Sequence, residues 1–239
     1  MSLTGTRVEG YILHEIIHAG GFSRVYLATA PDDRTVIFRI LRKSKVLHPR
    51  ARHQFLHGLD LMCRLDHPHI VRCLARGSFQ CRPFAALEFV EGKNLFHWIR
   101  GHDESWLPWR FSAAAQLASA LEYLHANRIL FIDLKLENVL LSYGGELKLT
   151  DFDLACTFDE VPRWWRKPAG TPSYLAPELF AGHLPSPASD VYSLGLVLRA
   201  MFPERTDTPI DQFTANCLDP APKARPTSFR PVYLAAGLI

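Results

Sequence analysis

Hydrophobic and polar residues follow different patterns in two parts of this chain. In residues 8–89, short apolar runs are separated by turns, which is typical of β-strands; the clearest runs are Val25–Ala28, Thr35–Leu41 and Phe84–Val90. One segment of this part, residues 52–64, carries apolar side chains at helical spacing instead, at Phe55, Leu59 and Met62. The pattern predicts a small β-rich unit with one main helix.

After Gly92 the pattern becomes helical. Residues 112–126 are predicted to form a helix, because leucines repeat every three to four residues in an alanine-rich background, at Leu117, Leu121 and Leu124. A second helix is predicted after Pro187, with Ser189 or Asp190 as its start signal. Helical signals weaken after Phe202.

Together the two patterns predict one α+β domain in two lobes over residues 8–231. The small β-rich lobe is expected in residues 8–89, the connection at 88–92 and the larger helical lobe in 93–231. The apolar tail 232–239 is too short to span a membrane and is expected to pack on the domain.

Composition excludes several classes of protein. A chain of 239 residues that is 48% hydrophobic can bury a substantial core, and its net charge of +3 comes from scattered basic residues, so no nucleic-acid partner is expected. No apolar stretch approaches the ~18 residues of a spanning helix. The five cysteines form no C-x-x-C pair, so neither a disulfide framework nor a zinc site is predicted, and a reducing, cytoplasmic setting is expected. The oligomeric state is not indicated.

The chemistry-bearing residues are concentrated between Asp133 and Asp151. The stretch Asp133-Leu134-Lys135-Leu136-Glu137-Asn138 precedes Asp151-Phe152-Asp153. Two acids and an amide around a lysine can hold metal ions on a nucleotide and orient a hydroxyl for attack. The first stretch resembles the serine/threonine-specific catalytic loop of the eukaryotic-type protein kinases, and Asp-Phe-Asp resembles their Asp-Phe-Gly metal-binding motif.

This resemblance implies a role for each matching residue. Asp133 would orient the substrate hydroxyl, Lys135 would neutralise the transferred phosphoryl group, and Asn138 and Asp151 would bind Mg²⁺ on ATP. An isolated aspartate is more often a helix cap or a turn residue, but several matches in register make that interpretation weaker.

The string Gly170–Glu178 is the most specific match to the family. The resemblance implies that Thr171 bonds to Asp133 and Lys135. It also implies that Glu178 pairs with Arg225 and that Asp190 anchors the backbone of the catalytic loop. These last two roles are structural.

The nucleotide side departs from the family pattern. Gly20 matches the middle glycine of the phosphate loop and Val25 the residue that covers adenine, whereas His18 and Ser23 replace the other glycines. Read alone, Gly20-Gly21 is an ordinary hairpin turn.

Two further departures concern charge. Arg39 stands where the phosphate-binding lysine is expected, and Gly58 where its glutamate partner is expected. The alternative for Arg39 is an exposed strand residue. The resemblance assigns four more residues to the nucleotide site, namely Leu87, Glu88, Val90 and Leu140.

The activation segment also departs from the pattern. Ile132 replaces the arginine that receives a phosphate in the family, and Lys167 occupies the usual phosphorylation position, so control by phosphorylation there is not expected. The adjacent Trp164 and Trp165 could anchor a partner or pack inward.

The sequence therefore supports two functions. The first is a serine/threonine protein kinase, weak or unconventional, that moves the γ-phosphate of ATP to a protein hydroxyl. The alternative is a pseudokinase that acts as a binding, scaffolding or allosteric module, because Arg39 and Gly58 replace the expected lysine and glutamate. Small-molecule kinases of the aminoglycoside type share the two-lobed plan but lack a string like Gly170–Glu178.

Overall fold

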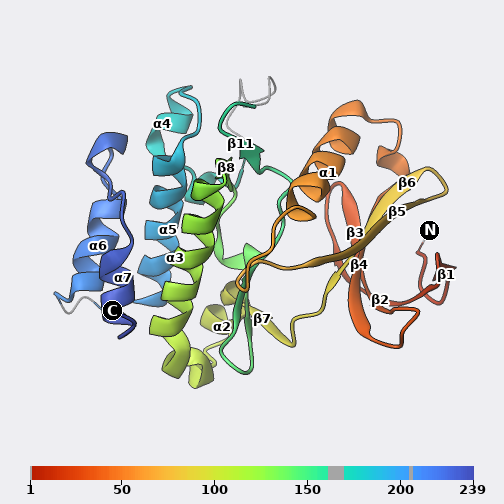
Figure 1. The fold of residues 1–239 in the computed structure, drawn as a ribbon, viewed down its shortest axis with the longest axis horizontal. Helices are drawn as coiled ribbons and strands as arrows, with labels where there is room; N and C mark the ends of the chain where they lie inside the picture. The colour runs from red at the N-terminus through yellow and green to blue at the C-terminus, as the bar shows by residue number, and fades with distance from the viewer. Residues whose placement is uncertain (1, 161–169, 205–206) are drawn as a thin grey trace. The chain divides into compact units, whose positions relative to one another are not determined.

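The computed structural model describes residues 2–160, 170–204 and 207–239. The described chain forms two compact units. The first consists of the residues up to Asp66 together with Val71–Phe89, and the second of His67–Ile70 together with the residues from Val90 onward. Their elements are labelled in Figure 1. The predictions for Trp164, Trp165 and Lys167 fall outside the described residues.

The first unit is built on a six-stranded antiparallel sheet in the order β1-β2-β3-β4-β6-β5. The strands are β1 (Arg7–Val8), β2 (Tyr11–Ala19), β3 (Ser23–Thr29), β4 (Thr35–Leu41), β5 (Cys73–Phe79) and β6 (Arg82–Glu88). All three predicted strands are present: β4 has the predicted bounds, whereas β6 ends at Glu88 and not at Val90 as predicted. A core of aromatic and branched residues stabilises the sheet, with Phe38 and Phe84 stacked at 4.6 Å between ring centroids.

The helix of the first unit is α1 (Pro49–Met62), preceded by the 3₁₀ turn η1 (Lys43–Lys45). It starts three residues before the predicted segment because Pro49 occupies its first turn and His48 caps it, its Nδ1 accepting from Ala51 N at 3.2 Å. The helix buries Ala51, Gln54, Phe55, Gly58, Leu59, Leu61 and Met62.

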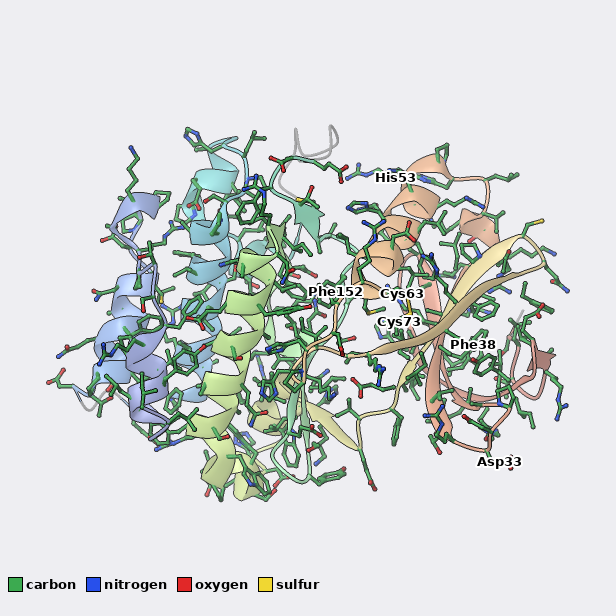
Figure 2. The ribbon with its side chains drawn as sticks, in the orientation of Figure 1. Asp33, Phe38, His53, Cys63, Cys73 and Phe152 are labelled. Carbon is green, nitrogen blue, oxygen red and sulfur yellow. A yellow bond between two sulfur atoms is a disulfide. The ribbon has the colours of Figure 1, made fainter. Side chains whose placement is uncertain are left out.

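A disulfide joins Cys63, at the end of α1, to Cys73, at the start of β5 (Figure 2). Their Cα atoms are 5.1 Å apart, which is within the range for a disulfide. The expectation that the cysteines are unpaired is therefore wrong for these two. The chain turns back on itself between α1 and β5, and this brings together two residues that no C-x-x-C spacing marks. The cytoplasmic setting stays a prediction.

The second unit is mainly helical. Its helices are α2 (Leu95–Arg100), α3 (Arg110–Ala126), α4 (Pro177–Phe180), α5 (Pro187–Met201), α6 (Pro209–Cys217) and α7 (Arg230–Ala235), with 3₁₀ turns η2 (Glu104–Trp109), η3 (Leu136–Asn138), η5 (Pro172–Tyr174) and η6 (Pro222–Ala224). In Figure 1, α3 and α5 lie side by side, and α6 and α7 pack against them.

Short strands complete this unit and carry its loops. They form a three-stranded sheet in the order β10 (Leu147–Leu149), β9 (Val139–Ser142), β7 (Gly92–Asn94), and a pair made of β8 (Ile129–Leu130) and β11 (Cys156–Thr157). Both β9–β10 and β8–β11 are antiparallel. The ends of these strands hold the residues of the predicted catalytic loop and metal site.

Helix boundaries in the second unit correct several expectations. Neither Ser189 nor Asp190, the two start signals proposed for this helix, begins it. The cap of α5 is Ser186, and the Ser189 side chain completes a capping box by accepting from Ser186 N at 3.2 Å. Helix α7 crosses the expected boundary between residues 231 and 232: Val232 is buried, whereas Leu238 and Ile239 are exposed. No helix among the described residues is long and apolar enough to cross a membrane.

Candidate active site

Asp133 is the centre of a hydrogen-bond network in the second unit. Its Oδ2 accepts from Lys135 Nζ at 2.6 Å and from Asn138 Nδ2 at 3.2 Å. Its Oδ1 accepts from Thr171 N at 3.0 Å and Thr171 Oγ1 at 3.1 Å. Lys135 Nζ also donates to Thr171 Oγ1 at 2.9 Å. The four residues that the sequence placed together by resemblance thus form one connected network, which fixes the orientation of the Asp133 carboxylate.

Asn138 and Asp151 lie at the same end of the β9–β10 hairpin. Asn138 immediately precedes β9, and Thr150 N donates to Asn138 O at 2.9 Å, so Asp151 directly follows a residue bonded to Asn138. Asp151 has a left-handed backbone with φ of +67°, a conformation that aspartate tolerates better than most residues.

The donors at this position fit magnesium. Asn138 Nδ2 donates to Asp133 O at 2.9 Å, so its side-chain oxygen is the atom offered to a cation, and Asp151 supplies a carboxylate. Magnesium in proteins is usually held by one or two carboxylates together with substrate phosphates and water. In the part of the chain that the structure describes, no group of three His, Cys, Asp or Glu side chains could hold a metal ion.

Asp190 anchors the backbone of the catalytic loop, as predicted. Its carboxylate, which is 1% exposed, accepts from Phe131 N at 3.0 Å and from Ile132 N at 2.7 Å. His125 of α3 adds a third bond, with Nε2 2.9 Å from Asp190 Oδ2. Three elements therefore meet at one buried acid, and this fixes the approach of the chain to Asp133.

Ile132 has a strained backbone, with φ of +73°. A left-handed conformation in a β-branched residue costs about 1–3 kcal/mol, so the surrounding structure must compensate for it. The bond from its N–H to Asp190 provides part of this compensation. Burial provides another part, because Ile132 packs in an apolar cluster with Leu130, Cys156, Leu175, Ala176 and Leu179. The family resemblance places a phosphate-binding arginine at position 132. In this structure Ile132 makes apolar contacts instead.

Phe152 and Asp153 follow Asp151, the predicted metal ligand. Phe152 is buried and contacts Phe131 edge to face, with ring centroids 5.0 Å apart. Asp151 has a positive φ, whereas Asp153 does not. The backbone at 153 therefore does not need the freedom of glycine, and the aspartate fits there without that strain.

Glu178 and Arg225 form the predicted buried pair. Arg225 donates from both terminal nitrogens to the two carboxylate oxygens, each at 2.8 Å, and Ser189 Oγ donates to Glu178 Oε1 at 2.8 Å. Burial would raise the pKa of Glu178, but the Arg225 guanidinium and the Ser189 hydroxyl outweigh it and hold the pKa below its usual range. The pair fastens the segment that follows Thr171.

Arg39, in the first unit, is 8% exposed, so its interpretation as an exposed strand residue is wrong. Its Nε donates to Ser23 Oγ at 3.2 Å, and its Cζ lies 5.2 Å from the centroid of the Phe55 ring. Asp60, the acid nearest to Gly58 along α1, forms an ion pair with Arg76 of β5 instead. Arg39 is therefore a buried residue of β4.

The glycines of the predicted phosphate loop form the turn between β2 and β3. Arg42 binds this turn, its Nη1 donating to Gly20 O at 3.0 Å and its N donating to Phe22 O at 2.8 Å. A Cβ on Gly20 would lie 3.2 Å from His18 Nε2, so a larger residue would press on the histidine. Val25 pairs with Arg39 across the strands.

The other predicted nucleotide-site residues are divided between the units. Leu87 is buried in β6 of the first unit, and Glu88 Oε1 accepts from Arg72 N at 2.6 Å in the same unit. Val90 and Leu140 are half-buried residues of the second unit, and Leu140 lies in β9. Their contact with a nucleotide stays a prediction.

Comparison with known proteins agrees with this geometry. The protein kinase domain family matches residues 11–216. The chain belongs to the eukaryotic-type serine/threonine protein kinase family. Both the fold prediction and the family resemblance are thereby confirmed. Domains of this family act on proteins with ATP, typically together with Mg²⁺.

Several curated relatives of this kinase domain are bacterial or plant enzymes. It is 39% identical over 189 residues to the serine/threonine-protein kinase PknK of Mycobacterium tuberculosis, covering 77% of this chain and 17% of the relative. It is 33% identical over 196 residues to CBL-interacting protein kinase 31 of rice, Oryza sativa subsp. japonica, with 80% and 44% covered. It is 31% identical over 199 residues to PrkC of Bacillus subtilis, with 82% and 31% covered. The chain thus spans less than half the length of these relatives.

Some residues that contact the predicted site residues of this kinase domain were missed from the sequence. Phe55 was assigned only to the apolar face of a helix, and Ser23 only to a missing glycine. His125, which bonds Asp190, was not singled out, although it lies in the last turn of a predicted helix just before the catalytic loop. Each of these contacts joins two different elements, and the spacing of residues along one element does not predict such a contact.

Proposed function

We propose that this kinase domain transfers the γ-phosphate of ATP to serine or threonine hydroxyls of proteins. The network of Asp133, Lys135, Asn138 and Thr171 carries this proposal. A binding module needs a stable fold, but it has no need for a carboxylate that is fixed through both oxygens by a lysine, an amide and a threonine.

Each residue of the network has a separate task. Asp133 would accept a hydrogen bond from the substrate hydroxyl, orient its oxygen toward the phosphorus and take its proton. Lys135 would place an ammonium beside the transferred group and offset its charge. Thr171 would hold the carboxylate in place through two hydrogen bonds, which supports catalysis by positioning.

The metal and the phosphates would be held by different residues. Bound magnesium would offset the charge of the phosphates, and Asn138 and Asp151 would hold it. Arg39 would contact the phosphates as the cation that replaces the family's lysine. A planar guanidinium can bind phosphate oxygens through two nitrogens, whereas a lysine acts as a compact point charge.

Asp133→Asn tests the proposal directly. The purified protein should phosphorylate itself or a serine-containing peptide in the presence of ATP and MgCl₂. The variant should lose about 10²- to 10⁴-fold in rate, the usual contribution of a positioned base. It should retain the thermal shift produced by ATP and MgCl₂. Asp32→Asn, a matched change at a half-exposed carboxylate of the first unit, should have no effect. Equal rates for the wild type and Asp133→Asn would refute phosphoryl transfer.

The second candidate is a pseudokinase that binds ATP or a protein without turnover. Position 58 favours it, because α1 carries a buried glycine where the family has an acid. A thermal shift with ATP but no phosphate transfer above the Asp133→Asn rate would select this function.

A further inference from the structure

Three departures from the kinase pattern lie close together in the first unit. Ser23 replaces a glycine of the phosphate loop, Arg39 replaces the lysine, and Gly58 replaces the glutamate. Arg39 contacts Ser23 directly, and it also contacts helix α1, which contains Gly58. These contacts also bring in Phe55, which no family motif marks.

The sheet register places Ser23 beside Arg39. Ser23 pairs with Leu41 and Val25 pairs with Arg39 across β3 and β4, so Ser23 and Arg39 are diagonal neighbours on one face of the sheet. At such a position, only a residue with a side-chain acceptor can bond the guanidinium. The hydroxyl does so, since Arg39 Nε donates to Ser23 Oγ at 3.2 Å and Ser23 is 5% exposed. A glycine at 23 would offer no acceptor.

Helix α1 supplies the second contact. Phe55 is fully buried, and its ring lies under the guanidinium with Cζ 5.2 Å from the centroid. A cation over an aromatic face is attracted by the negative face of the ring, and more strongly when water is excluded. Gly58 lies one turn farther along the same face of α1. This face therefore presents an aromatic ring to the cation, whereas a family member presents a carboxylate.

We propose that Ser23 and Phe55 are positioning residues that hold Arg39 for phosphate binding and replace the lysine–glutamate ion pair of the family. This inference rests on the proposed function. The serine accepts from Nε, and the guanidinium carbon lies over the Phe55 ring. These two contacts restrict the rotation of the group and so limit the directions of its two terminal nitrogens, which form the fork suited to phosphate oxygens.

The arrangement can be tested without nucleotide by nuclear magnetic resonance of the arginine Nε–Hε groups. Arg39→Lys assigns the Arg39 signal. The Arg39 signal should exchange slowly with water and carry a ring-current shift, in contrast to the signal of Arg7, an exposed residue of β1. Phe55→Leu should remove the ring-current shift, and Ser23→Ala should accelerate exchange. An Arg39 signal that exchanges as fast as that of Arg7 would overturn the inference.

Steady-state kinetics then test the role of the two residues. Ser23→Ala and Phe55→Leu should each raise the KM for ATP about ten-fold with a smaller change in kcat, because one bond to a charged group corresponds to about ten-fold in affinity. Ser23→Thr keeps the hydroxyl and should retain the wild-type KM. Ser78→Gly, a change in exposed β5, is the matched control for a general effect on the sheet.

The decisive comparison uses the Arg39→Lys/Gly58→Glu background, which restores the family pair. In that background Ser23→Ala and Phe55→Leu should change the KM for ATP less than about two-fold, since contacting residues do not act additively. The same ten-fold cost in both backgrounds would show that Ser23 and Phe55 act only on general stability. A protected Arg39 signal in a protein without phosphate transfer would leave the positioning intact and refute the proposed function alone.

Discussion

Replacing Arg225 by methionine should lower the free energy of unfolding by about 3–5 kcal/mol, because it leaves the buried Glu178 carboxylate without its counter-ion. The guanidinium is 3% exposed and uses all five of its N–H donors. Two go to Glu178 at 2.8 Å, and the others go to the carbonyl oxygens of Ala188 at 2.9 Å, Pro220 at 3.3 Å and Asp219 at 2.8 Å.

The pH dependence separates the loss of this ion pair from a simple packing defect. In the wild type the pKa of Glu178 lies below its ordinary value near 4.5, so the pair stabilises the protein above that pH and its contribution is lost as pH falls through the folded pKa. In Arg225→Met burial is no longer outweighed and should raise the pKa of Glu178. The carboxylate would then be protonated at higher pH, and the cost of the variant should shrink on acidification.

Urea denaturation followed by circular dichroism at pH 7 and pH 5 measures both effects. Arg225→Lys should recover only part of the loss, since an ammonium has three donors and cannot reproduce the fork. The double variant Arg225→Met/Glu178→Leu should be more stable than Arg225→Met alone, because it removes the unpaired charge. A cost below about 1 kcal/mol, as for a surface pair, or an equal cost at both pH values would refute the reasoning.

Three further predictions concern other contacts. Reducing the Cys63–Cys73 disulfide, whose partners are 10 residues apart, should lower the free energy of unfolding by about 2–3 kcal/mol. Urea denaturation with and without dithiothreitol measures this, and a Cys63→Ser/Cys73→Ser variant should not respond to the reductant. Asp190→Asn should cost about 2–3 kcal/mol, because an amide has a single oxygen and one of the two backbone N–H donors is left without an acceptor. An unchanged melting temperature would contradict this. Burial lowers the pKa of His67 and of His69, so stability should fall as pH drops below about 6.5, where the unfolded histidines take up protons first; the His67→Gln variant should show a shallower dependence.

Much of the fold was readable because its determinants are local. The short apolar run Thr35–Leu41 predicted β4 with its observed bounds, and the leucine repeat predicted α3 to within two residues. The predicted first residues of the helices were less accurate, because a helix is capped by a polar side chain that lies outside the apolar pattern. His48 caps α1 in this way. Helix α6 was missed although Thr208 and Asp211 form a capping box with a proline at the first position.

The catalytic half of the site was predictable for a different reason. Asp133, Lys135 and Asn138 lie within six residues and form a motif, and the string after Gly170 marks Thr171. Recognising the two strings sufficed to predict hydrogen bonds between residues 36 and 38 positions apart. No such string contains the disulfide, because its two cysteines are brought together only by the turn between α1 and β5.

The nucleotide half shows why departures from a family pattern cannot simply be counted. If the losses of the lysine and the glutamate each cost about 10²- to 10³-fold, their product would leave negligible activity. That multiplication assumes that the changes are independent. Ser23 and Phe55 both contact Arg39, and residues in contact commonly couple. An arginine held by a hydroxyl and a ring does not need the acid that is missing at Gly58, so the expected loss is smaller than the product.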